Sequence, residues 1–74
     1  MWCVMRVERL VMMANQIAAY FNSQPGGAPE NPIADHLRKF WDPRMRREII
    51  AHVERGGAGL DPAALKAVRL LARV

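Results

Sequence analysis

The sequence predicts an all-helical fold, a small bundle of about four helices in which one long N-terminal helix precedes three shorter ones. Apolar residues recur at spacings of three and four through most of the chain, which is the periodicity of amphipathic helices. Three Asx-Pro pairs, at 31–32, 42–43 and 61–62, each combine a helix-capping residue with a proline suited to the first helical turn. No segment shows the alternation typical of a strand.

The first helix is expected from about Val4 to Asn22. Its apolar face comprises Val7, Leu10, Val11, Ala14, Ile17, Ala18 and Phe21. Residues 23–30 contain two prolines and two glycines, a composition that predicts a flexible loop. With no other break of this kind, residues 1–74 are expected to form a single helical domain.

The second helix is expected to begin at Asn31-Pro32 and to end near Trp41, because a residue before proline disfavours helical geometry. Its predicted apolar face comprises Ile33, Leu37 and Phe40, with Ala34 and Trp41 at one border. The third helix follows from Asp42-Pro43 to about Arg55, with Met45, Ile49 and Val53 along one side. Gly56-Gly57 then ends it, as glycine does just past a helix.

The fourth helix is expected from Asp61-Pro62 to the C-terminus, and after its first turn only Lys66, Arg69 and Arg73 are polar. A helix that is apolar most of the way round is normally buried on more than one side. A chain of 74 residues has little surface with which to cover it, so part of this helix is expected to contact another protein. The alternative is that its alanines form a neutral exposed face.

Composition points to a partner as well. The hydrophobic fraction of 51% excludes disorder over the whole length, and the net charge of +4 favours acidic partners. One cysteine permits no internal disulfide, and two histidines are too few for a four-ligand zinc site. Binding to a partner is then the remaining way to stabilise so small a core.

The N-terminal segment predicts neither a membrane span nor a signal peptide. Its apolar start is interrupted by Arg6, Glu8 and Arg9 well short of the ~20 residues that a span requires, and its cations follow the apolar run. Together with the single thiol of Cys3, this predicts a cytoplasmic location.

No catalytic, cofactor-binding or metal site is predicted in this chain. His36 and His52 sit at the borders of apolar helical faces, which favours half-buried structural roles over catalysis. Asp42 and Asp61 are explained as helix caps. The glycines at 56–59 lack the preceding strand and the lysine of a phosphate-binding loop.

The run 38–47 concentrates five cations and two aromatic residues around a single acid. It is open to three interpretations: a nucleic-acid surface, a solvated rim around a buried Phe40, or an anchor for protein contacts. The sharp break at Pro43 disfavours a helix-turn-helix and with it the nucleic-acid interpretation. The protein-contact interpretation predicts these partner-binding residues: Arg38, Trp41, Arg44, Arg46 and Arg47, with Leu65 and Val68 from the fourth helix.

Three blocks of sequence resemble the delta subunit of NAD-dependent formate dehydrogenase. They are RLVMMANQIAAYF at 9–21, ADHLRKFWDPRMR at 34–46 and GGAGLDP at 56–62, of which the middle block is the most specific. The Trp2-Cys3 start and the loop at 24–29 depart from the family pattern without touching these blocks.

The resemblance implies a non-catalytic accessory subunit that supports assembly or stability of a formate-oxidising complex and binds its large catalytic subunit. In that family a molybdenum or tungsten pterin, iron–sulfur clusters and FMN belong to larger subunits, and NAD is the electron acceptor. The alternative from another class is a small basic nucleic-acid-binding module, and a third is a standalone regulator with the same helices.

Overall fold

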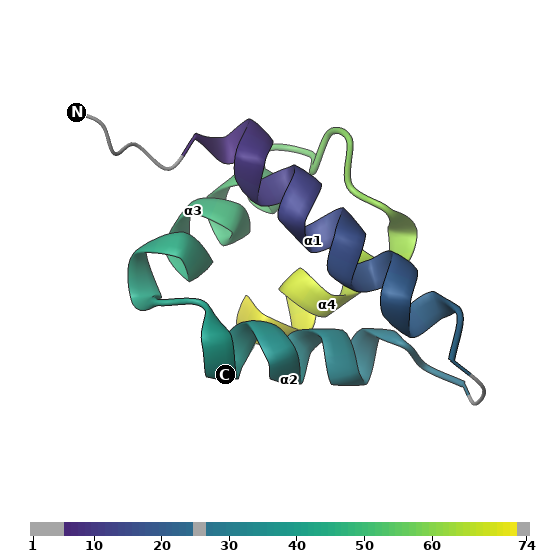
Figure 1. Cartoon of the computed structure of the whole chain (residues 1–74). Coiled ribbons are helices and arrows are strands. Elements are labelled where there is room, and N and C mark those ends of the chain that lie inside the picture. The colour runs from purple at the N-terminus through teal and green to yellow at the C-terminus, as the bar shows by residue number, and fades with distance from the viewer. Residues whose placement is uncertain (1–5, 25–26, 73–74) are drawn as a thin grey trace.

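The computed structural model describes residues 6–24 and 27–72, and within these ranges the chain folds into four α-helices and no β-strand. The helices are α1 (Val7–Asn22), α2 (Glu30–Phe40), α3 (Pro43–Glu54) and α4 (Pro62–Ala72). In Figure 1, α4 lies behind and between α1 and α2, and it packs against each of the other three helices. The predicted all-helical fold is confirmed, whereas the predicted helix start at Val4 lies outside the described residues.

The starts of α3 and α4 follow the capping chemistry that the sequence predicts. Asp42 Oδ1 accepts a hydrogen bond from the backbone N–H of Met45 at 2.9 Å. Asp61 Oδ2 accepts one from the N–H of Ala63 at 3.0 Å. In each case the carboxylate satisfies an amide that has no acceptor inside the helix, so both aspartates have the structural role expected of them.

The start of α2 differs from the prediction. The helix begins at Glu30, after Pro29, and has no side-chain cap, so the expected capping role of Asn31 is wrong. Pro32 falls at the third helical position, where a missing N–H costs little because first-turn amides have no intrahelical acceptor. The carboxylate of Glu30 also interacts favourably with the helix dipole at this end.

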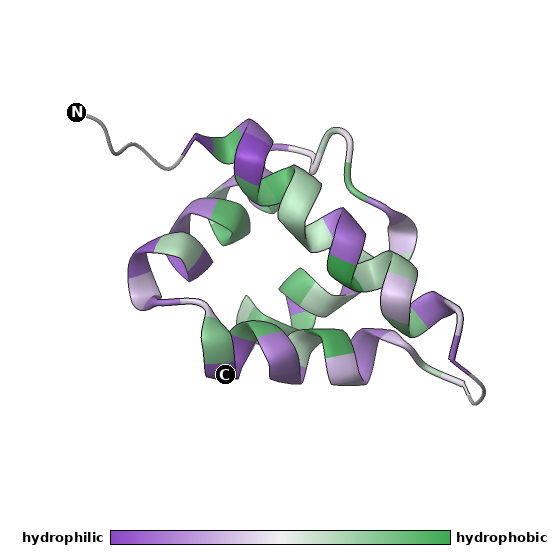
Figure 2. Ribbon diagram, in the orientation of Figure 1, coloured by the Kyte–Doolittle hydropathy of each residue, from purple (hydrophilic) through white to green (hydrophobic). Residues whose placement is uncertain are grey.

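The fourth helix is buried along one side, where it packs against the other three helices. Most of α4 is hydrophobic (Figure 2), and its buried residues are Ala64, Ala67, Val68 and Leu71. The chain covers these residues itself, and Ala64 and Ala67 are fully buried. The expected contact of the remaining surface of α4 with another protein stays a prediction. Alanine side chains let neighbouring helices approach closely, and so three short helices are enough to enclose this side of α4.

Trp41 and Phe40 exchange the places that helical periodicity assigns to them. The side chain of Trp41 is 5% exposed and belongs to the core, whereas that of Phe40 is 71% exposed. The reason is that α2 ends at Phe40, and Trp41 has an extended backbone conformation, with φ −90° and ψ 138°. Extrapolating the helical face one residue past the end of the helix gives the wrong side.

A side-chain clamp joins α1 to the loop between α3 and α4. Asn15 Nδ2 donates to the carbonyl oxygen of Gly59 at 2.9 Å, and Asn15 Oδ1 accepts from the N–H of Asp61 at 2.8 Å. One amide therefore satisfies two backbone groups more than 40 residues away in the sequence. This clamp fixes the point at which α4 enters the core.

Replacing Asn15 by alanine should remove both clamp contacts and lower the free energy of unfolding by roughly 1–2 kcal/mol, since a backbone donor and acceptor lose their partner. Gln16→Ala, an exposed amide on the same helix, is the matched control and should change stability by less than about 0.5 kcal/mol. Urea denaturation followed by circular dichroism measures both. Equal losses for the two variants would show that the clamp does not stabilise the fold.

Candidate partner-binding site

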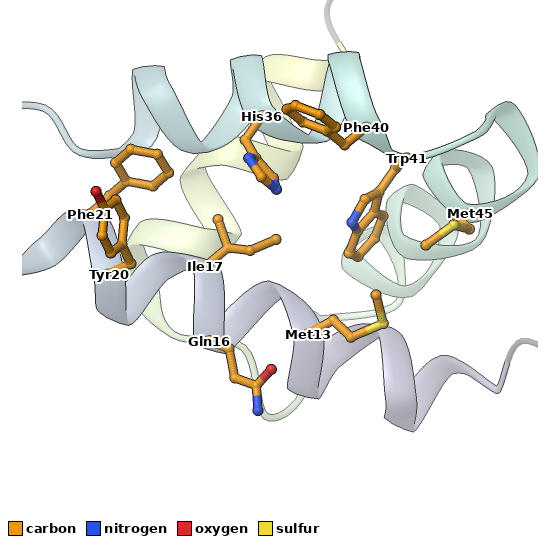
Figure 3. Close-up of a pocket in the computed structure, with 9 residues that line it drawn as sticks. All are labelled: Met13, Gln16, Ile17, Tyr20, Phe21, His36, Phe40, Trp41 and Met45. Atoms are coloured by element: carbon orange, nitrogen blue, oxygen red, sulfur yellow. The ribbon is translucent and has the colours of Figure 1, made fainter.

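An apolar groove of about 640 Å³ lies between α1 and α2 and reaches the first turn of α3. It is lined by Met13, Gln16, Ile17, Tyr20, Phe21, His36, Phe40, Trp41 and Met45. In Figure 3 the α1 residues form one wall, His36 and Phe40 project from α2 opposite them, and Trp41 with Met45 closes one end. Most of this lining is hydrocarbon, aromatic ring or thioether, which is the composition of surfaces that bind apolar groups.

The largest exposed apolar side chains gather at this groove. In the described part of the chain the exposed large hydrophobic residues are Met12, Tyr20 and Phe40, at 53%, 61% and 71% exposure, and the last two line the groove. Tyr20 packs edge-on against Phe21, with ring centroids 5.0 Å apart, and Phe40 lies 4.7 Å from the His36 ring. Clustered exposed aromatics of this kind mark an interaction surface.

The predicted partner-binding residues of the run 38–47 have different environments at the corner between α2 and α3. Trp41 belongs to the core and also lines the groove, so its predicted contact with a partner stays a prediction. The Arg46 guanidinium donates from Nη1 to the carbonyl oxygens of Arg38 at 2.8 Å and Trp41 at 2.9 Å, so it closes the last turn of α2. Arg38, Arg44 and Arg47 are exposed.

The two residues predicted on the fourth helix are also less accessible than expected. Val68 is fully buried and Leu65 half-buried, because both belong to the helix that the other three enclose. Val68 borders a second, smaller groove between α3 and α4, whose other lining residues are Ile50, Val53, Glu54, Arg69 and Ala72. Trp41 and Val68 therefore line different grooves.

The titratable side chains near these surfaces make structural contacts. His52 Nε2 lies 2.8 Å from the carbonyl oxygen of Ala58 and links α3 to the glycine-rich loop. His36 packs between the rings of Phe21, at 6.5 Å, and Phe40. Over residues 6–24 and 27–72 no group of three or more His, Cys, Asp or Glu residues is placed to bind a metal. Within the same ranges no helix is both long and apolar enough to cross a membrane.

Sequence reasoning missed the α1 wall of the groove, although a signal for it exists. Met13, Ile17 and Tyr20 follow one another at spacings of four and three, and so form an apolar stripe beside the buried column of Leu10 and Ala14. The width of this stripe indicates that α1 has more apolar surface than one packing contact uses. Which part stays open depends on where α2 and α4 lie, and periodicity does not contain that information.

Comparison with known protein families identifies the family to which this chain belongs. The model of the family described as NADH-dependent formate dehydrogenase delta subunit FdsD matches residues 9–68 of the 74. The chain belongs to this family. The resemblance drawn from the three sequence blocks is thereby confirmed.

The match to the delta-subunit family runs from the first turn of α1 into α4 and includes every residue that lines the α1–α2 groove. Neither a curated protein nor a solved structure matches the chain.

Alanine substitutions at two adjacent positions should distinguish the core residue from the surface residue at the end of α2. Trp41→Ala removes a buried indole and should lower the free energy of unfolding by about 3–5 kcal/mol, much of the stability of a chain this small. Phe40→Ala should change it by less than about 0.5 kcal/mol, because that ring is exposed. Chemical denaturation of the isolated chain measures both, and a well-folded Trp41→Ala variant would contradict the core assignment.

Proposed function

We propose that this protein is a non-catalytic accessory subunit of an NAD-dependent formate dehydrogenase, which binds the large catalytic subunit and supports assembly or stability of the complex. The family match over residues 9–68 carries the proposal. The α1–α2 groove supports it physically, since an exposed apolar surface bordered by aromatic residues is a feature of proteins that work bound to a partner.

In this proposal the redox chemistry belongs to the other subunits. The larger subunits hold the molybdenum or tungsten pterin, the iron–sulfur clusters and FMN, and they transfer electrons from formate to NAD. The described residues of this chain contribute contacts instead, because the aspartates cap helices and the histidines pack or bond within the fold. The complex is proposed to be cytoplasmic.

The size of the chain gives a physical reason for an accessory role. A domain of 74 residues buries only about 60% of the surface that its unfolded chain exposes, so its own stability is small. Burying one large apolar side chain at an interface contributes roughly 1.5–3 kcal/mol. Covering Tyr20 and Phe40 would therefore stabilise this chain and hold it on its partner at the same time.

The structure favours protein contacts over the nucleic-acid alternative. Two of the five cations in the run 38–47 already have partners within the chain. Arg46 bonds to backbone carbonyls, and Lys39 Nζ lies 3.1 Å from Asp35 Oδ2. The carboxylates of Asp35 and Asp42 interrupt the remaining cations, whereas a surface that binds a phosphate backbone requires a continuous track of positive charge.

Co-expression with the other formate dehydrogenase subunits tests the proposed function. The chain should co-purify with the catalytic subunit, and deleting its gene should lower the yield or the thermal stability of the assembled complex. Formate oxidation per correctly assembled complex should stay within about twofold, because the chain supplies no reacting group. Failure of the wild-type chain to co-purify would contradict the proposal.

Retention on nucleic acid is expected to be weak and to disappear as salt rises to physiological concentration, since few phosphate contacts are available. Fluorescence anisotropy with labelled duplex and single-stranded DNA and RNA, measured from about 50 to 200 mM salt, tests this. Tight, sequence-dependent binding at the upper concentration would favour the nucleic-acid-binding module instead.

A further inference from the structure

We propose that the α1–α2 groove binds an amphipathic helix of a partner formate dehydrogenase subunit, one that presents apolar residues to the groove and carboxylates beside them. This inference rests on the proposed function and specifies the surface and the chemistry of the contact. Four features of the groove support it: its length, its lack of a strand edge, its adaptable lining and the charges at its borders.

The length of the groove corresponds to a short helical segment. Met13, Ile17 and Tyr20 mark its α1 wall and span eight residues, or about 10 Å of helix from the first to the last. Two turns of a partner helix have the same length and present apolar side chains at positions i, i+3 or i+4, and i+7. Such side chains enter between Met13 at one end and Phe21 at the other.

The backbone around the groove selects a helix over an extended peptide. Both walls are helices, α1 and α2, whose amide and carbonyl groups bond to one another within each helix. A strand would need an exposed sheet edge, and the described residues contain no strand. The groove therefore offers side chains only, which is the way amphipathic helices are recognised.

The lining combines adaptable and directional groups. Met13 and Met45 have flexible thioether side chains that adjust to the shape of an inserted residue. Gln16 and His36 are the polar side chains among the aromatic and aliphatic ones, and they offer hydrogen bonds to the polar edge of the partner helix. Phe40 and Tyr20 supply exposed rings that become buried on binding.

The charges at the borders of the groove favour an acidic partner. Exposed Arg9 lies four residues before Met13 and exposed Lys39 three residues after His36, so helical spacing places each on the groove side of its helix. Exposed Arg44 adjoins Met45. Acids are also present: Glu48 lies three residues after Met45, and Asp35 pairs with Lys39.

That ion pair is solvent-exposed, with side chains 66% and 52% accessible, and exposed pairs contribute little. Lys39 therefore exchanges Asp35 for a partner carboxylate at low cost. The net charge of +4 disfavours a second copy of this chain as the occupant, because like charges would meet across the groove.

Binding of the double variant Tyr20→Ala/Phe40→Ala to the catalytic subunit tests the groove directly. Its dissociation constant should rise roughly tenfold or more over wild type, while circular dichroism shows unchanged helicity, since both rings are exposed. Met12→Ala is the matched control, an exposed large apolar residue outside the groove lining, and should stay within about twofold.

If the double variant binds as tightly as the wild-type chain, the groove is not the binding site, while the proposed function stays intact. A wild-type chain that does not bind would instead refute the proposed function.

Reversal of single charges tests the acidic character of the occupant. Arg9→Glu, beside the groove, should weaken binding several-fold more than Lys66→Glu, an exposed position on α4 outside the groove lining that changes net charge equally. Equal effects of the two reversals would overturn the local charge complementarity.

Photo-crosslinking identifies the occupant. With p-benzoylphenylalanine in place of Phe40 in the assembled complex, the crosslinked peptide should be an amphipathic helical segment rich in Asp and Glu from a partner subunit. Crosslinks to a second copy of this chain, or to an extended or basic segment, would overturn the assignment.

Discussion

The close packing of α4 against the other three helices is the contact on which the rest of the structure depends. It is possible because Ala64 and Ala67, both fully buried, keep α4 thin where its neighbours approach. α4 packs most extensively against α2, and this contact sets the position of α2. With α2 held there, α1 buries its column of Leu10, Ala14 and Ala18 in the core, and its next apolar stripe is only partly covered. The groove is the consequence of that arrangement.

The turn at 41–43 connects this core to the surface. Asp42 caps α3, Arg46 closes the last carbonyls of α2, and the extended backbone of Trp41 directs its indole inward. The same turn leaves Phe40 outside, on the last residue of α2. Among the described residues, this one break in the helix thus provides both the largest buried aromatic side chain and the most exposed one. Core stability and the binding surface are therefore set by the same few residues.

Sequence predicts the local parts of this fold well, because capping and periodicity are local chemistry. Asp42 and Asp61 cap helices as expected, and the core stripe of α1 is the predicted one. The errors arise where tertiary contacts decide. Trp41 lies just past a helix end, where the helical projection no longer applies. The burial of Val68 depends on how three other helices are placed, which the pattern of α4 does not encode.

In the proposed complex, the groove would also couple folding to binding. Trp41 belongs to the core and lines the groove, so a partner helix bound there would contact a side chain on which the fold depends. A ligand that binds only the folded state stabilises it by about 2.7 kcal/mol at a hundredfold excess over its Kd. For a domain whose own stability is on the order of 5 kcal/mol, that increment is a large fraction of the total. Association would then explain an open apolar groove in so small a chain: in the proposed complex, the partner would supply the packing that the four helices leave incomplete.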